Sequence, residues 1–137
     1  MKTLSLNLPV PPSVNHMYFN ARGGGKRLTG KAEQYIRDSK ALINMEIENQ
    51  KWIKQTKGVW LYVDMVFYFP DRRIRDASNC LKLLLDVMQD TIYENDMYAL
   101  PRIQSVEYDK ENPRVEVVIR NQSRMDRDIA LKVVGLL

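Results

Sequence analysis

Four polar side chains suited to phosphate chemistry recur at short, regular spacing between residues 76 and 86. They are Asp76, Asn79, Lys82 and Asp86, and in a helix the last three would share one face. Carboxylate and amide oxygens ligate hard divalent cations, and an ammonium group neutralises a phosphate. An ordinary solvated helix face with a Lys82–Asp86 ion pair would give the same spacing, so this face alone does not establish a site.

The charges on either side of this stretch favour the chemical interpretation. Three arginines, Arg72, Arg73 and Arg75, directly precede Asp76, and an acidic segment at 94–96 follows closely enough to fold back toward the helix. Carboxylates gathered among cations are what a divalent metal and a phosphate substrate together require. The formal net charge of +4 also favours a polyanionic partner.

The helix that would carry these residues also has a packing side. Ser78 is the expected N-cap, because its hydroxyl can accept a hydrogen bond from an amide of the first turn. The leucine and methionine side chains expected to form the buried stripe recur at helical spacing: Leu81, Leu84, Leu85 and Met88. One side of the helix therefore packs, while another presents an amide, an amine and a carboxylate.

Alternating apolar patterns predict four strands around this helix, at 3–8, 59–69, 102–108 and 114–120. The 59–69 segment is apolar or aromatic on both sides, which predicts a central strand covered on both faces. We take its aromatic residues as core or subunit interface. The last of the four strands is expected to form a hairpin with the one before it. The expected fold is α/β (α+β), a small mixed β-sheet with packed helices in a single domain.

Two further segments complete the expected architecture. A helix is predicted from a Thr29 cap to about Lys54, with a face of small and apolar side chains. The tail at 121–137 is expected to form a short helix or strand that docks on the body or on a second subunit. Its Asp126 is interpreted as acidity at a helix start, which the helix dipole favours, rather than as a metal ligand.

Composition limits the class of protein. At 137 residues, with 45% hydrophobic and 28% charged residues, the chain reads as one soluble domain. The single cysteine, Cys80, excludes an internal disulfide and is expected to be buried. The single histidine, His16, argues against histidine-centred catalysis. No long apolar span or leader is present in the sequence, so we expect a cytoplasmic protein without a membrane partner.

A glycine-rich basic loop offers a second place for phosphate contacts. Arg22, Lys26 and Arg27 flank three consecutive glycines, and no acidic residue lies between Asn20 and Lys31. Glycines let the backbone approach a phosphate closely, although loops of this composition are often only mobile connectors. The spacing does not match a Walker A loop.

Several separated motifs together resemble the RusA family of Holliday junction resolvases. The Pro70–Asp86 run matches its central pattern, Asn95–Asp96 stand where the family has an Asp-Asp pair, and Leu8–Asn15 looks like its opening strand and Pro-Pro-Ser-x-Asn exit. The basic loop and the helix that follows it also fit. The resemblance covers residues 3–120 and leaves the tail as an extension beyond a nuclease domain at 1–120.

The resemblance implies a RusA-like fold and an endodeoxyribonuclease that resolves four-way DNA junctions in recombination and repair. It implies Mg²⁺, with Mn²⁺ as a substitute, no small-molecule cofactor, and a homodimer with two sites facing one branched DNA. The expected metal-ligating carboxylates are Asp76 and Asp96, with Asn79, Lys82 and Ser78 in the same catalytic site. The expected DNA contacts are Arg72, Arg73, Arg75, Arg22, Lys26, Arg27 and Asn15.

One departure from the family pattern leaves the activity open. The family reads Asp-x-Asp-Asn at the head of the helix, whereas this chain has Ser78 in place of the second carboxylate. A hydroxyl can ligate magnesium or hold a water, but it brings no charge. The site then has weaker metal affinity, borrows a carboxylate from Asp71, Asp86 or Glu94, or belongs to a catalytically silent DNA-binding relative. A non-enzymatic scaffold is the third alternative.

Overall fold

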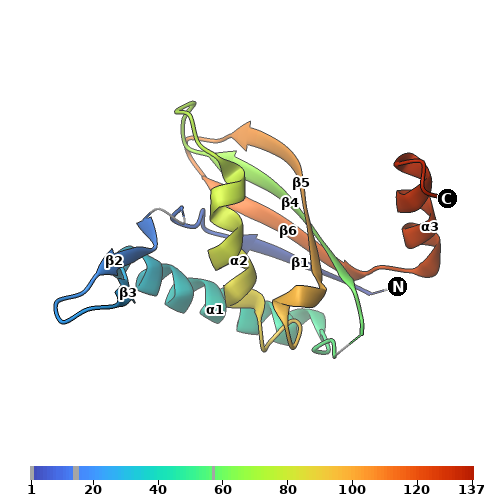
Figure 1. Cartoon of the computed structure of the whole chain (residues 1–137), viewed down its shortest axis with the longest axis horizontal. Coiled ribbons are helices and arrows are strands. Elements are labelled where there is room, and N and C mark those ends of the chain that lie inside the picture. The colour runs from blue at the N-terminus through green and yellow to red at the C-terminus, as the bar shows by residue number, and fades with distance from the viewer. Residues whose placement is uncertain (1, 14–15, 57) are drawn as a thin grey trace.

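A four-stranded sheet in the order β1-β6-β4-β5 forms the centre of the structure (Figure 1). The computed structural model describes residues 2–13, 16–56 and 58–137, so the expected DNA contact Asn15 lies outside the described residues. The strands are β1 (Thr3–Leu8), β2 (Tyr18–Asn20), β3 (Lys26–Leu28), β4 (Leu61–Phe69), β5 (Ala99–Tyr108) and β6 (Arg114–Asn121). The α-helices are α1 (Gly30–Gln50), α2 (Leu81–Met88) and α3 (Arg124–Val133). This mixed sheet with packed helices confirms the predicted fold class.

The sheet is mixed because α2 connects two parallel neighbours. β4 pairs in parallel with β5, and β6 pairs antiparallel with both β4 and β1. The prediction that β4 is central is therefore confirmed. The predicted hairpin between β5 and β6 is wrong, because a helical crossover makes β5 a parallel neighbour of β4 and leaves the other side of β4 to β6.

One face of the sheet carries the hydrophobic core. The alternate residues of β1, β4 and β6 that point to this face are buried together with residues of α1 and α2. On the opposite face Tyr62 is buried, whereas Asp64, Val66 and Tyr68 are only half-buried. The prediction that β4 is covered on both faces is therefore confirmed for the core face, but a single chain does not cover the opposite face. On the other face, which we call the open face, no helix of the described part of the chain packs against the sheet (Figure 1).

The helix α1 begins where the sequence predicts and ends earlier. The Thr29 hydroxyl oxygen accepts a hydrogen bond from the Ala32 amide, which confirms Thr29 as the N-cap. The helix stops at Gln50 rather than near Lys54. Lys51 adopts the left-handed conformation with φ 55°, and the amides of Lys51 and Trp52 close the last turn on carbonyls inside the helix.

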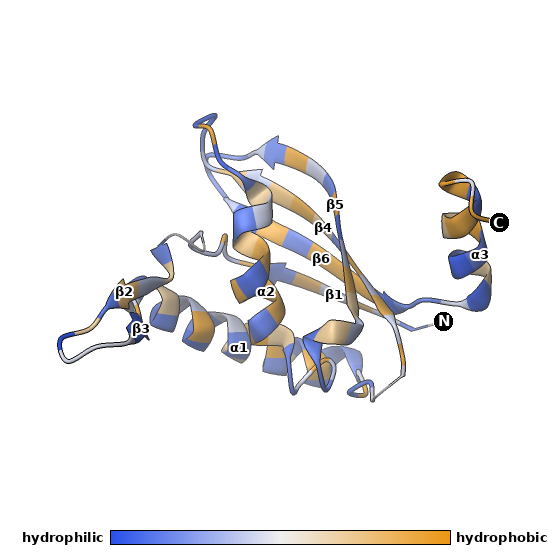
Figure 2. Cartoon of the chain, viewed as in Figure 1, coloured by the Kyte–Doolittle hydropathy of each residue, from blue (hydrophilic) through white to orange (hydrophobic). Residues whose placement is uncertain are grey.

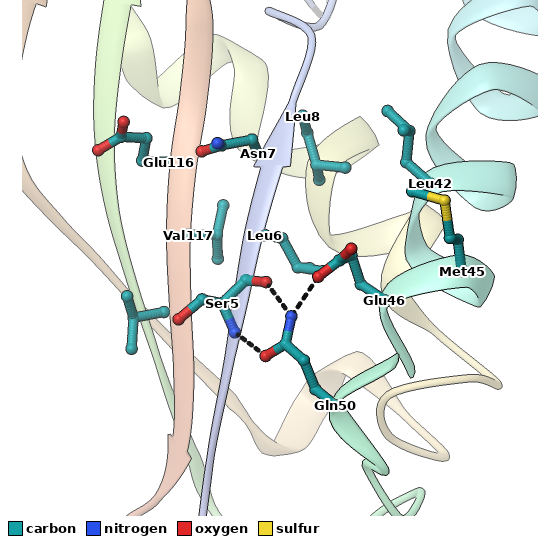
Figure 3. A pocket seen from close by; sticks show the side chains of 11 residues that line it. Ser5, Leu6, Asn7, Leu8, Leu42, Met45, Glu46, Gln50, Glu116 and Val117 are labelled. Atoms are coloured by element: carbon teal, nitrogen blue, oxygen red, sulfur yellow. Dashed lines mark hydrogen bonds between the residues drawn. The ribbon is translucent and has the colours of Figure 1, made fainter. Parts of the chain in front are cut away.

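The free edge of β1 is blocked by a side chain from α1 (Figure 3). The Ser5 amide donates to Gln50 Oε1 at 2.9 Å, and Gln50 Nε2 donates to the Ser5 carbonyl at 2.7 Å. Gln50 also bonds Glu46. The amide of Gln50 thus takes the place of a neighbouring strand at one residue of the edge, which protects a sheet edge against pairing with other chains.

Two segments project from the body at opposite ends of the molecule. The β2–β3 hairpin projects from one end of the molecule, and α3 stands apart at the other (Figure 1). The tail was expected to form a short helix or a strand, and it forms a helix. None of the residues of α3 is buried. No helix among the described residues combines the length and apolar character needed to cross a bilayer.

Candidate active site

Asp76 organises the turn that leads into α2. Its Oδ1 accepts hydrogen bonds from the Ser78 amide at 3.0 Å and from the Ser78 hydroxyl at 2.5 Å. Asp76 is therefore the N-cap of the 3₁₀ turn that precedes α2, and the prediction that Ser78 is the N-cap of the helix is wrong. A 3₁₀ turn over Ala77–Cys80 precedes α2, which begins only at Leu81.

The side chains that α2 buries differ in part from the predicted stripe. The buried residues of the helix are Leu83, Leu84, Val87 and Met88, whereas the predicted stripe members Leu81 and Leu85 are half-buried. A 3₁₀ turn advances by about 3.0 residues per turn rather than 3.6, so it rotates the following helix relative to a continuous α-helix. Leu83 and Val87 are apolar too, so the sequence pattern alone did not decide which side of the helix is buried.

A pocket of about 300 Å³ opens beside Asp76 and Asn79. Arg75 and Phe69 border it from the end of β4 and the turn that follows. The remaining walls come from the segment after β1 and from Cys80 of the 3₁₀ turn. The lining residues are Val10, Pro11, Ser13, His16, Phe69, Arg75, Asp76, Asn79 and Cys80. Two of the predicted catalytic residues therefore share one concave site.

Cys80 attaches the opening proline segment to this site. Its thiol donates to the Pro11 carbonyl at 3.6 Å, and the residue is buried, as expected. Burial, followed by the negative charge of Asp76, raises the pKa of the Cys80 thiol, which keeps it protonated. The residue thus has a packing role between two segments far apart in the sequence.

His16 and Ser13 line the pocket, and the sequence interpretation did not assign them a role there. The His16 amide donates to the Ser13 carbonyl at 2.9 Å, and the His16 carbonyl accepts from the Thr29 hydroxyl at 2.8 Å. These bonds bring the segment back toward the start of α1. The only signal in the sequence was that Ser13 is the serine of the Pro-Pro-Ser-x-Asn motif and His16 directly follows it, since a single histidine has no pattern of its own.

The three arginines before Asp76 are not equivalent. Arg75 forms an ion pair with Asp71 at 2.7 Å, and a hydrogen bond from Arg75 and another from the Arg73 amide lower the pKa of Asp71. Arg72 stacks its guanidinium on the Tyr108 ring at 4.4 Å. The Arg73 side chain is largely exposed, with a contact to Asp71 at 3.9 Å. Arg73 is thus the arginine of this turn most available to a phosphate.

Lys82 lies one turn further along the helix face. Its Nζ is 3.4 Å from Asp86 Oδ2, and both side chains are more than a third exposed. This is the i, i+4 pair that an ordinary solvated face would also form, and such pairs contribute little to stability. The pair leaves both groups accessible from solvent.

Asp96 lies at the other end of α2 from Asp76. The Asp96 amide donates a hydrogen bond at 3.1 Å to Oε1 of Gln89, the residue directly after α2. Asp96 is also the first residue of a 3₁₀ turn over Asp96–Tyr98. Eight α-helical residues and four 3₁₀ residues span about 20 Å between Asp76 and Gln89. The acidic segment folds back, as expected, but onto the C-terminal end of the helix. One chain therefore does not bring Asp76 and Asp96 together.

The donor set at Asp76 suits a magnesium ion that keeps most of its water. Within the described ranges, no three acidic, histidine or cysteine side chains gather closely enough to hold a metal. Magnesium is commonly bound by one or two carboxylates together with waters and substrate phosphates. Asp76, with the amide of Asn79 in the same pocket, meets that lower requirement.

The basic loop forms the tip of the β2–β3 hairpin. Arg22, Lys26 and Arg27 are all exposed, and Lys26 and Arg27 pair across the hairpin with Asn20 and Phe19. Three consecutive glycines, 23–25, have positive φ angles of 79–96°. Left-handed conformations at three successive positions require glycine, which explains the composition of this loop.

Comparison with known proteins adds one match. The family model described as Endodeoxyribonuclease RusA matches residues 9–120. No curated protein matches the sequence. The matched range contains the whole pocket, the arginine turn and the Asp96 segment, whereas α3 lies outside it.

Proposed function

Because the chain belongs to the RusA family of endodeoxyribonucleases, we propose that it resolves four-way DNA junctions by metal-dependent phosphodiester hydrolysis in recombination and repair. The observation that carries the proposal is the pocket that Asp76 and Asn79 line together with Arg75 and the segment after β1. The family resemblance read from the sequence over 3–120 is confirmed over 9–120.

Asp76 is the proposed ligand for Mg²⁺, with Mn²⁺ as a substitute. Bound Mg²⁺ supplies positive charge to the scissile phosphate and acidifies the attacking water. Asn79 lies in the same pocket, where its amide can orient Asp76 or a water. Ser78 keeps Asp76 in position through the two hydrogen bonds to Oδ1.

Cationic side chains are proposed to hold the DNA around this pocket. Lys82 is exposed on the helix face and supplies a point charge to the phosphate under attack. The proposed contacts to flanking phosphates are Arg72, Arg73, Arg75, Arg22, Lys26, Arg27 and Asn15. Contacts of this kind give affinity that falls steeply with salt and carry little sequence information.

A homodimer is part of the proposal for two reasons. A junction has two strands to cut, and a two-fold assembly matches that symmetry. In addition, Asp96 lies about 20 Å along α2 from Asp76, so Asp96 could ligate the same ion only if a second copy supplied it. The proposed metal site therefore contains Asp76 of one copy and Asp96 of the other.

A catalytically silent junction-binding protein is the second candidate, and Ser78 favours it. The family position that carries a carboxylate is a serine here, and its hydroxyl is already bonded to Asp76. Such a protein would keep the basic hairpin and the arginine turn. It would bind junctions tightly without cutting them.

Cleavage of a synthetic four-way junction beside a linear duplex of the same arms tests both candidates. Mg²⁺ and Mn²⁺ are titrated, and Asp76→Asn serves as the control. Paired symmetric nicks in the junction alone, absent in Asp76→Asn, are the expected result. Tight junction binding without cutting in either metal would establish the silent candidate. Neither binding nor cutting would contradict both.

A further inference from the structure

The tail helix exposes a continuous apolar stripe. Met125, Ile129 and Val133 recur every four residues along α3, and 72%, 55% and 80% of their surfaces are exposed. We call these three residues the tail stripe. Figure 2 shows apolar residues over the part of α3 farthest from the sheet. An amphipathic helix of this kind normally packs its apolar side against another element.

The attachment of α3 prevents the tail stripe from packing on its own sheet. Ser123 and Asp126 form a capping box, and Arg120 of β6 forms an ion pair with Asp126 at 2.5 Å. These bonds fix the first turn of α3 at the end of β6 and direct the helix away from the body (Figure 1). Folding back onto the same sheet would require the chain to break them.

The open face of the sheet has the composition of a protein interface. Arg102 stacks on Tyr62 at 3.4 Å, and Arg114 stacks on Tyr68 at 3.8 Å. Val118, on the same face, is 41% exposed. None of β4, β5 and β6 contains a lysine. Interfaces are enriched in arginine and tyrosine and depleted of lysine relative to other protein surface.

The charges of the open face argue against DNA as its partner. Asp64 pairs with Arg102, and Glu116 pairs with Arg114, so acidic groups neutralise the arginines. Burial raises the pKa of Asp64, but the bonds from Arg102 and Gln104 outweigh it and lower the pKa overall. A face of stacked, neutralised arginines suits a protein surface better than a polyanion.

The two unpartnered surfaces belong to the same side of the molecule. Tyr62 and Arg120 are direct neighbours across β4 and β6, so Arg120, which anchors α3, lies on the open face. In a two-fold dimer both copies carry the same pair of surfaces, so a contact of one helix with the face of the other copy is matched by the reciprocal contact. A second copy of the chain thus supplies a receptor for each tail stripe.

We propose that α3 is an exchanged arm, whose tail stripe docks on the open face of a second copy of this chain. This contact rests on the homodimer of the proposed function and adds an interface to it, but it does not depend on DNA cleavage. It also accounts for a helix that lies outside the matched family range and has no fully buried residue.

Sedimentation velocity of the full-length chain without DNA tests this contact. The double variant Ile129→Asp/Val133→Asp removes the apolar surface, and Val118→Arg changes the receptor. Ile53→Asp, at an exposed apolar residue of the loop after α1, is the matched control. The first two variants should raise the dimer dissociation constant roughly tenfold or more, and the control should not change it.

A photo-crosslinking residue at position 133 identifies the docking site directly. The expected product is a covalent dimer joined to β4 or β6 of the other copy. Cross-links within one chain, or between two α3 helices, would overturn the proposal, as would an unchanged dissociation constant or a wild-type chain that stays monomeric. Because no readout uses cleavage, a silent protein could still confirm the contact, and an active one could contradict it.

Discussion

Ser78 donates two hydrogen bonds to one oxygen of Asp76, from its hydroxyl at 2.5 Å and from its amide at 3.0 Å. The residue that replaces the family's second carboxylate is thus engaged with the first. The amide bond comes from the backbone and does not depend on the side chain. The hydrogen bond from the hydroxyl depends on the serine side chain. It places a neutral donor on the Asp76 oxygen that would otherwise be available to ligate a metal.

The first prediction is that Ser78→Asp strengthens metal binding. The substitution places a second carboxylate beside Asp76, which should lower the Mg²⁺ concentration for half-maximal junction cleavage about tenfold. Without metal the two like charges repel, so the melting temperature should fall in EDTA and recover in Mg²⁺. Both quantities are measured on the same preparation.

Ser78→Asn is the control for this prediction. It has the same size as the aspartate but no charge. If the asparagine and aspartate variants show the same magnesium dependence, the added charge has no role and another carboxylate already serves the metal.

The second prediction concerns the separation of Asp76 and Asp96 along α2. If Asp96 acts on the partner's ion, a mixed dimer of Asp76→Asn and Asp96→Asn chains contains one intact site and one doubly altered site. Each variant alone should be inactive, whereas co-expressed mixed dimers should introduce single nicks in the junction. Native mass spectrometry confirms that mixed dimers have formed. Inactive mixed dimers would place both carboxylates of each site on one chain, and an active Asp96→Asn homodimer would remove Asp96 from the site.

The third prediction separates catalysis from stability at Lys82. Lys82→Met should reduce the cleavage rate roughly a hundredfold, because the charge opposite the phosphate is lost. Its pair with Asp86 is exposed, so the free energy of unfolding should change by less than about 0.5 kcal/mol. Asp86→Asn breaks the same ion pair and should keep most of the activity. Equal losses in the two variants would mean that the pair itself matters.

Local patterns in the sequence predicted most of the elements. The alternation of Leu4, Leu6 and Leu8 predicted β1, and Thr29 predicted the start of α1, because both signals depend on neighbouring residues alone. The pairing of β6 could not be predicted in this way. Whether the strand that contains Val117 pairs with β5 or with β4 depends on the crossover through α2, and that crossover is a property of the whole sheet.

The site was predicted in part for the same reason. Asp76 and Asn79 share a pocket because they are three residues apart at one helix start. Asp96 is near α2 in the sequence, but a crossover between parallel strands begins at one end of the sheet and returns at the other. His16 reaches the pocket through a fold-back that no periodic pattern marks.

The fourth prediction tests the edge of β1. Gln50→Ala removes both bonds to the Ser5 backbone and should lower the free energy of unfolding by about 1 kcal/mol. It also frees the strand edge, so aggregates should increase in size-exclusion chromatography at high concentration. Asn49→Ala, at the exposed neighbouring position, should stay within about 0.5 kcal/mol of the original chain in urea denaturation. A similar loss in both variants would point to helix propensity rather than to the edge.

The fifth prediction is that α3 stays attached to β6 down to about pH 4 and detaches only at lower pH. Hydrogen bonds from Arg120 and then from Ser123 hold the pKa of Asp126 below its ordinary value. A lowered folded pKa gives stability that is present above the unfolded value of about 3.9 and is lost as the pH falls through the folded value. The amide shifts of 124–133 in NMR spectra should therefore stay constant down to about pH 4 and move only below it. Asp126→Asn should loosen α3 at neutral pH, whereas Asp128→Asn, outside the capping box, should not; a transition well above pH 4 would contradict the Arg120–Asp126 anchor.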